Sequence, residues 1–174
     1  MSDSHPLVRL AAQAIEVYLT EERIIDPPDS LFAEMTGALK PAGVFVCLKR
    51  EDRLRGCIGT TEPMHETLAV EVIRNAIGAA TRDPRFPSLE PYELEGLDIT
   101  VDVLGPAEAV GGPGELDHTR YGVILRAGDR RSVLLPDIEG VDSVREQLAL
   151  ARQKAGIGPE DPVELLRFEI VRYR

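Results

Sequence analysis

Residues 53–60 read Arg53-Leu54-Arg55-Gly56-Cys57-Ile58-Gly59-Thr60, a β-strand pattern that carries one cysteine between two glycines. Glycine weakens a strand, because it loses the most conformational freedom on folding and contributes no side chain to the packing. The preceding stretch, residues 43–49, is rich in β-branched and aromatic residues, and a short polar segment joins the two. The sequence therefore predicts a β-hairpin whose second strand contains glycine at two positions, where glycine is unusual.

A two-residue turn at positions 51 and 52 sets the expected register of this hairpin. It pairs Cys47 with Gly56 and Val46 with Cys57. Because side chains alternate between the two faces of a strand, the cysteines then lie on opposite faces of the sheet. This register excludes a disulfide between them unless the sheet is rebuilt, and a slip of one residue would overturn that conclusion.

The same register divides the hairpin into a core face and a mixed face. The expected core face carries Phe45, Cys47, Leu54 and Ile58. The expected mixed face carries Val44, Val46, Leu48, Arg55 and Cys57. We therefore expect Cys47 to be structural and Cys57 to share its face with an arginine.

Hydrophobic periodicity and turn residues predict the other elements. Helices are expected over residues 7–19, 64–80 and 143–155, the second capped by Thr60 or Thr61 and the third ended by Gly156. Strands are expected over residues 97–104, 121–125, 132–135 and 165–173. Since consecutive strands come as hairpins, the sequence predicts an α+β fold with a mostly antiparallel sheet flanked by helices. The 174 residues suit a single domain, 1–174, with two lobes.

The composition disfavours several classes of function. Acidic residues outnumber basic ones 30 to 20, and a net charge of -10 repels a phosphate backbone, so nucleic-acid binding is not expected. No apolar run approaches the roughly 20 residues that cross a bilayer, and the first residues do not resemble a signal peptide. With only two cysteines, the expected location is the reducing cytoplasm.

Cys57 is the candidate catalytic residue. A thiolate is the reactive form of cysteine, and Arg55, two residues along on the same face, brings a positive charge to within about 6.5–7 Å at the backbone. Gly56 and Gly59 would let a substrate or another backbone approach closely. The alternative is a small buried hydrophobe, since free cysteine is among the most buried residue types. No general base with an orienting partner is recognisable, so both interpretations stay open.

Arginines and an aspartate supply a candidate ligand site. Arg55 and Arg85 each present a planar donor fork that suits carboxylate or phosphate, so together they predict a pocket for a small anionic ligand. The alternative for Arg85 is a structural ion pair with Asp83, in a segment whose Asp-Pro step favours an extended or turn conformation.

His65 and Glu71 complete the set of candidate ligand-binding residues. His65 could reach back toward the strand of residues 53–60, and Glu71 could converge on the same place. A solvated helix face is nevertheless the more ordinary interpretation of Glu71 and of Asn75 one turn further on. No Cys-x-x-Cys pair or His-x-x-x-His helix is present, so no metal site is expected. The glycine-rich residues 111–114 lack the context of a phosphate-binding loop, and no motif calls for a cofactor.

Several blocks of the chain resemble the AMMECR-domain family. The match begins with Leu54-Arg55-Gly56-Cys57-Ile58-Gly59, which resembles the signature hexapeptide of that family. Further blocks that resemble it are Gly43–Val46, Asn75–Ala76, Asp83–Pro87, Gly96–Leu104, Gly122–Leu125, Leu134–Pro136, Lys154–Gly156 and Arg167–Glu169. The chain departs from many relatives in its Glu51-Asp52 turn and in having no tryptophan. The resemblance nevertheless covers nearly the whole chain.

This resemblance implies a place in a pathway and leaves the chemistry open. Bacterial and archaeal members are the A component of the AmmeMemoRadiSam system, which implies a Memo-like protein and a radical-SAM protein as partners in a modification pathway of unknown chemistry. It also implies two lobes with the signature strand at a cleft between them. We expect either a component that binds a small anionic ligand or substrate there and uses Cys57, or a non-catalytic interaction module that docks its partners at that cleft.

Overall fold

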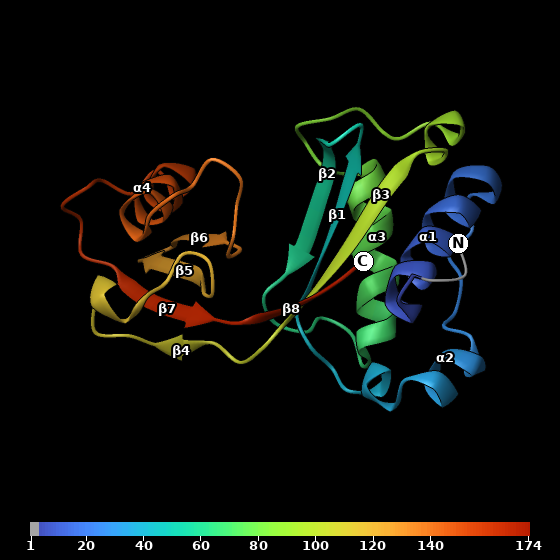
Figure 1. Ribbon diagram of the computed structural model, residues 1–174, viewed down its shortest axis with the longest axis horizontal. Helices are drawn as coiled ribbons and strands as arrows, with labels where there is room; N and C mark the ends of the chain where they lie inside the picture. The colour runs from blue at the N-terminus through green and yellow to red at the C-terminus, as the bar shows by residue number, and fades with distance from the viewer. Residues whose placement is uncertain (1–3) are drawn as a thin grey trace. The chain divides into compact units, whose positions relative to one another are not determined.

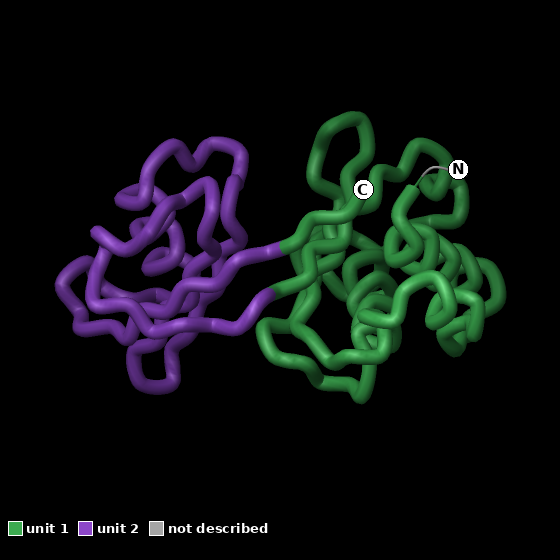
Figure 2. The backbone as a smooth tube through the Cα atoms, turned by 60° about the horizontal axis from the view of Figure 1, so that its bottom comes forward, with its two compact units in different colours: residues 1–104, 171–174 green, residues 105–170 purple. Residues whose placement is uncertain are grey.

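The computed structural model describes residues 4–174, and the chain passes twice between two units (Figure 2). Unit 1 comprises residues 1–104 and 171–174, and unit 2 comprises residues 105–170. Each unit contains one four-stranded antiparallel sheet and its own helices. The predicted α+β class is therefore confirmed, with two sheets in place of the single sheet expected.

Unit 1 carries the signature strand at the edge of its sheet, in the order β2-β1-β3-β8. The strands are β1 (Val44–Arg50), β2 (Arg53–Thr60), β3 (Leu97–Leu104) and β8 (Ile170–Tyr173). The helices are α1 (Pro6–Glu21), α2 (Asp29–Glu34) and α3 (Leu68–Thr81), with short 3-10 turns at Thr36–Leu39 and Pro91–Leu94. Helices α1 and α3 pack against each other and against one face of the sheet (Figure 1), and the core of unit 1 lies between them.

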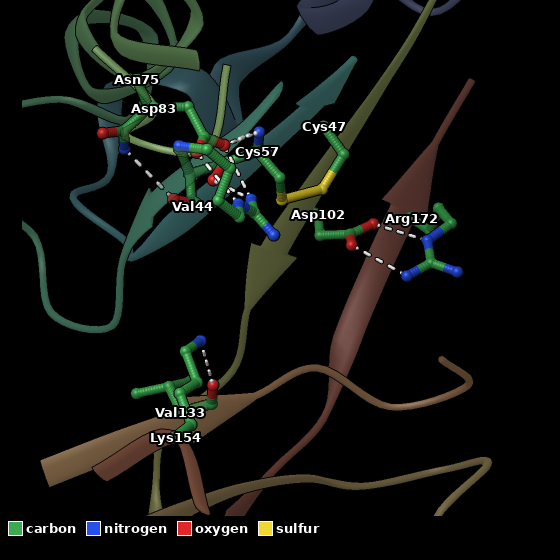
Figure 3. Close-up of a disulfide and its surroundings, with 10 residues drawn as sticks. Val44, Cys47, Cys57, Asn75, Asp83, Asp102, Val133, Lys154 and Arg172 are labelled. Atoms are coloured by element: carbon green, nitrogen blue, oxygen red, sulfur yellow. Dashed lines mark hydrogen bonds and ion pairs between the residues drawn. A yellow bond between two sulfur atoms is a disulfide. The ribbon is translucent and has the colours of Figure 1, made fainter. Parts of the chain in front are cut away.

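Unit 2 has its own small core. Its sheet has the order β4-β7-β5-β6, with strands β4 (Glu108–Ala109), β5 (Gly122–Ala127), β6 (Arg130–Leu134) and β7 (Glu164–Phe168). Helix α4 (Val144–Ala155) packs on β5 and β6, and Lys154 donates to the carbonyl of Val133 at 3.0 Å (Figure 3). Ser143 caps α4 and Gly156 ends it with a positive φ of 65°, as the sequence predicts. A 3-10 turn at Pro113–Glu115 completes the unit.

The predicted closing strand at residues 165–173 is divided between the two sheets. Strand β7 ends at Phe168 in the sheet of unit 2, and β8 begins at Ile170, the last residue of unit 2, and joins the sheet of unit 1. Between them the carbonyl of Glu169 accepts a hydrogen bond from the backbone N–H of Gly105 at 2.9 Å. The two crossings of the chain are thus tied to each other, and the uninterrupted β pattern of this segment gives no sign of the change of sheet.

The hairpin register contains a β-bulge that the sequence did not reveal. The two-residue turn is confirmed, with positive φ at both Glu51 (51°) and Asp52 (60°), and Lys49 pairs with Leu54. The register then shifts, so that Leu48 faces Gly56 and Arg55 is the extra residue. Every pair beyond the bulge is displaced by one position from the prediction.

The predicted division into core and mixed faces is wrong for the same reason. Val44, Val46 and Leu48 are fully buried on the helix side, while Phe45 and Cys47 are half-buried on the other face. Beyond the bulge, the β2 residues opposite these aliphatic side chains are Thr60, Ile58 and Gly56, and not Arg55 and Cys57.

The two glycines of the signature strand are explained by close packing on opposite faces. A Cβ built on Gly56 would overlap the carbonyl oxygen of Ala79 in α3, so this glycine lets the helix backbone touch the strand. A Cβ on Gly59 would overlap the ring of its cross-strand partner Phe45, which covers that position. The strand is therefore fixed from both sides around the cysteine.

Helix α3 begins four residues later than predicted. Thr67, not Thr60 or Thr61, is its N-cap, and its hydroxyl accepts from the backbone N–H of Val70 at 3.2 Å. Glu71 binds the segment before the helix through other backbone N–H groups, so that segment forms a loop and does not continue the helix.

Replacing Gly56 by alanine should destabilise unit 1, because the new methyl group has no room beside α3. We expect a loss of about 1–3 kcal/mol in the free energy of unfolding, the usual cost of overpacking, measured by urea denaturation. Gly37→Ala is the matched control in the same unit, since its Cβ would make only an ordinary 3.7 Å contact with Met35. Equal stability of the two variants would contradict the proposed close packing.

Candidate functional site

Cys57 lies at the open edge of the unit 1 sheet, directly opposite Cys47. The Cα atoms of the two cysteines are 4.1 Å apart, the spacing of a non-hydrogen-bonded pair in an antiparallel ladder. In such a pair the backbone N–H and C=O of each residue point away from the partner strand. For Cys57, on the edge strand, these groups point out of the sheet and need partners elsewhere.

Asp83, which is labelled in Figure 3, and Arg85 provide both partners and are hereafter called the edge clip. Oδ2 of Asp83 accepts from the backbone N–H of Cys57 at 2.8 Å. Nη2 of Arg85 donates to the backbone carbonyl of Cys57 at 3.3 Å. The edge clip thus replaces the backbone groups of a neighbouring strand at this one residue.

The edge clip is itself an ion pair with two direct hydrogen bonds between the side chains. Arg85 donates from Nη2 to Oδ2 of Asp83 at 2.7 Å and from Nε to Oδ1 at 2.9 Å. The Asp83 side chain is only 2% exposed, whereas that of Arg85 is 54% exposed. The hydrogen bond from Arg85, with the one from the Cys57 N–H, holds the pKa of the Asp83 carboxyl well below its usual range despite burial. The structural alternative that the sequence left open for Arg85 is therefore observed.

The two cysteines form a disulfide (Figure 3), which contradicts the sequence-based expectation. The bulge at Arg55 is the cause, because it moves Cys57 from opposite Val46 to opposite Cys47 and places both side chains on one face. That face is the one that α1 and α3 leave uncovered, and both cysteines are half-buried on it. Cys57 is therefore neither a free thiol in this structure nor a fully buried hydrophobe.

Arg55 binds a carboxylate that the sequence analysis did not identify. Its guanidinium donates to both oxygens of Glu93, from Nε at 2.8 Å and from Nη2 at 2.9 Å, and from Nη1 to the carbonyl of Pro87 at 3.0 Å. The hydrogen bond from Arg55 lowers the pKa of Glu93. With its side chain 15% exposed, Arg55 holds the segment after Pro87 against the signature strand.

The structure brings Arg55 and Arg85 to the same aromatic ring. The guanidinium carbons lie 6.0 Å and 5.5 Å from the ring centre of Phe86, within the range of cation–π contact. Each guanidinium is bound to a carboxylate of this chain, Arg55 to Glu93 and Arg85 to Asp83.

Glu71 and Asn75 are buried, which corrects their interpretation as a solvated helix face. The Glu71 side chain accepts from the hydroxyl of Thr60 at 2.6 Å and from the backbone N–H groups of Met64 and His65 at 2.8 and 2.9 Å. Asn75 donates to the same hydroxyl at 3.3 Å and to the carbonyl of Val44 at 3.1 Å. Together they anchor the end of the signature strand to α3.

His65 lies on the loop that Glu71 holds. It lines an open cavity of about 500 Å³ together with Pro63, Met64, Glu66 and Val70. The contact between Glu71 and the backbone of His65 brings these two predicted residues together, while the structure gives no contact from the imidazole to Cys57.

Another ion pair, between Asp102 and Arg172, lies on the cysteine face, and the sequence analysis did not identify it. Asp102 of β3 accepts from Nε and Nη2 of Arg172 of β8 at 2.8 and 2.9 Å (Figure 3), and its side chain is 1% exposed. Asp102 pairs with Phe45 across the ladder, which places it on the same face as Cys47.

Within residues 4–174, no three His, Cys, Asp or Glu side chains gather as metal ligands would. No described helix has the length and apolarity of a membrane span.

The edge clip should make stability depend on pH in the acid range. Because the folded pKa of Asp83 is depressed, its contribution is fully present above its unfolded value of about 3.9 and is lost as the pH falls toward the folded value. We expect the wild type to lose about 1 kcal/mol more than Asp83→Asn between pH 6 and pH 3, measured by urea unfolding. Glu169→Gln, which removes an exposed partner of Arg120, should keep the wild-type slope. Parallel curves for the wild type and Asp83→Asn would contradict this role.

Comparison with known proteins places this geometry in a family. A family model described as AMMECR1 matches residues 8–174. A protein of Thermotoga maritima is 49% identical over 177 residues, covering 100% of both chains. A protein of Clostridium acetobutylicum is 41% identical over 99% of this chain, which spans only 36% of that relative. The crystal structure of the uncharacterized protein PH0010 from Pyrococcus horikoshii matches 95% of this chain and 88% of its own, with a TM-score of 0.88 and 34% identity. These matches confirm the resemblance seen in the signature strand, and the chain belongs to the AMMECR1 family.

Proposed function

We propose that this chain is a cytoplasmic component of a modification pathway, that it acts with a Memo-like protein and a radical-SAM protein, and that Cys57 is its reactive group. The partners are those that the family resemblance implies. One observation carries the role of Cys57: the edge clip binds both polar groups of its main chain, and the residue is half-buried on the face that the helices leave uncovered. A sulfur held in this way is positioned for a reaction without being enclosed in the core.

The anionic ligand of this proposal would bind through Arg85. Arg85 uses Nε and Nη2 for Asp83 and Cys57, and among the described residues no hydrogen bond is seen from its Nη1. Its side chain is 54% exposed and lies beside the backbone of Cys57, so Nη1 is available to a carboxylate or phosphate of a substrate. Arg55 is a poorer candidate, because Glu93 and the Pro87 carbonyl occupy its donors.

A specific observation supports the alternative of a non-catalytic interaction module. Tyr92 is 73% exposed and Leu54 is 39% exposed, and Leu54 belongs to the signature hexapeptide itself. Tyrosine and arginine are enriched at protein interfaces, and an exposed ring beside the Arg55–Glu93 pair suits a partner protein.

Reconstitution with the two partners separates these functions. The readout is cleavage of S-adenosylmethionine by the radical-SAM protein, with and without this chain and the Memo-like protein, alongside pull-down of both partners. We expect Cys57→Ser to bind the partners normally and to lose the effect of the wild type on cleavage by about tenfold or more, the scale of losing a reacting group. Arg85→Ala should reduce the effect less, by weakening substrate binding.

The interaction module predicts the opposite pattern. Leu54→Ala combined with Tyr92→Ala would then abolish the pull-down, while Cys57→Ser would act like the wild type. That second result would refute the proposed role of Cys57.

A further inference from the structure

We propose that Cys47 and Cys57 are a redox pair, which accepts two electrons from a dithiol donor and returns to the disulfide by passing them to a disulfide acceptor. This inference rests on the proposed role of Cys57 as the reactive group, and assigns that role to the pair. It also names Asp83 and Arg85 as the positioning residues that hold the pair together.

The position of the two cysteines in the sheet supports thiol–disulfide exchange with a donor. They are directly opposite on neighbouring strands, with Cα atoms 4.1 Å apart, so the sulfurs meet without any change of register. Neither belongs to the buried core of unit 1, and both are half-buried on the face that α1 and α3 leave uncovered, from which a donor can approach. In a reducing compartment, disulfides at such positions are usually transient and serve catalysis or redox sensing.

The reductive half of the cycle balances with a dithiol donor, and the oxidative half is the same exchange in reverse, in which an acceptor disulfide is reduced to a dithiol. A donor thiolate attacks one sulfur of the pair, the Cys47–Cys57 bond breaks, and the released thiolate takes up a proton. The second donor thiol, as its thiolate, then attacks the donor sulfur of the mixed disulfide and releases the second cysteine, which is also protonated. The chain gains two electrons and two protons, and the donor leaves as its own disulfide.

The edge clip opposes separation of the strands when the bond is broken. Bonded sulfurs are about 2.05 Å apart, whereas unbonded heavy atoms prefer roughly 3.5–4.0 Å, so reduction pushes β2 away from β1. Asp83 and Arg85 bind the backbone of Cys57 from the outside, and Gly56 is packed on α3. These contacts keep the two thiols apposed, which favours return to the disulfide.

The redox pair is tested by counting thiols. Wild type, Cys47→Ser and Cys57→Ser are equilibrated in glutathione buffers of graded potential, or with a thioredoxin-type dithiol protein, and the free thiols are then labelled with a maleimide polymer. We expect the two wild-type thiols to appear together with one midpoint, and each variant to keep one thiol. Faster reduction by the protein dithiol than by glutathione at equal potential would support a dithiol donor, and faster reduction by glutathione, a monothiol, would contradict it. Two independently titrating thiols, or a disulfide that excess dithiothreitol leaves intact, would overturn the inference.

The S-adenosylmethionine assay distinguishes this inference from the proposed function. Loss of the effect in both Cys47→Ser and Cys57→Ser supports the pair. Loss in Cys57→Ser alone would leave Cys57 as a single nucleophile, so the inference would fail and the proposed function would stand. Full activity of both variants would contradict both the redox pair and the proposed role of Cys57.

The positioning role is tested with a matched pair of carboxylate-to-amide changes. Asp83→Asn weakens the edge clip, whereas Glu93→Gln weakens the neighbouring ion pair with Arg55, which does not touch the backbone of Cys57. We expect Asp83→Asn to shift the glutathione equilibrium toward the dithiol by about three- to tenfold, which corresponds to part of the free energy of a charge-assisted hydrogen bond. We expect Glu93→Gln to shift the same equilibrium by less than about twofold. Equal shifts in the two variants would refute the positioning role, whatever their effects on stability.

Discussion

The contact between the backbone of α3 and Gly56 is the constraint on which unit 1 depends. Because only a glycine lets the Ala79 carbonyl reach the strand, the helix lies close to the edge of the sheet and can supply polar side chains to it. Glu71 and Asn75 hold the end of β2 from this helix, and Asp83 follows two residues after the helix ends. The position of the edge clip is thus a consequence of how closely helix and strand approach.

Element types were predictable from the sequence, whereas the register was not. The turn at Glu51 and Asp52, the alternation of β3 and the caps of α4 are local signals, and the structure has each of them. The bulge at Arg55 leaves no local signal, because its arginine has the same spacing as a regularly paired one. A one-residue shift exchanges the faces of a strand, so this single error reversed both the assignment of the core and the conclusion about the disulfide.

Several residues of the candidate site could be predicted from the sequence, but the hydrogen bonds and ion pairs between them could not. Cys57, Asp83 and Arg85 stand out because glycine and proline surround them, and the structure joins them by direct hydrogen bonds. Glu93 and Asp102 gave no such signal, since their partners lie 38 and 70 residues away in the chain. The burial of Glu71 and Asn75 could have been predicted from the sequence, because both residues fall within the wide apolar arc of α3, where a polar side chain needs a hydrogen-bond partner.

The hydrogen bond between Gly105 and Glu169 has a consequence for the architecture of the chain. It closes the base of residues 105–170, whose two ends leave neighbouring strands β3 and β8 of the other sheet. Unit 2 is therefore an insertion into a strand connection of unit 1, and a short turn would suffice to bridge the gap. Both cysteines, the edge clip and helix α3 therefore belong to unit 1, and none of these parts lies in the inserted segment.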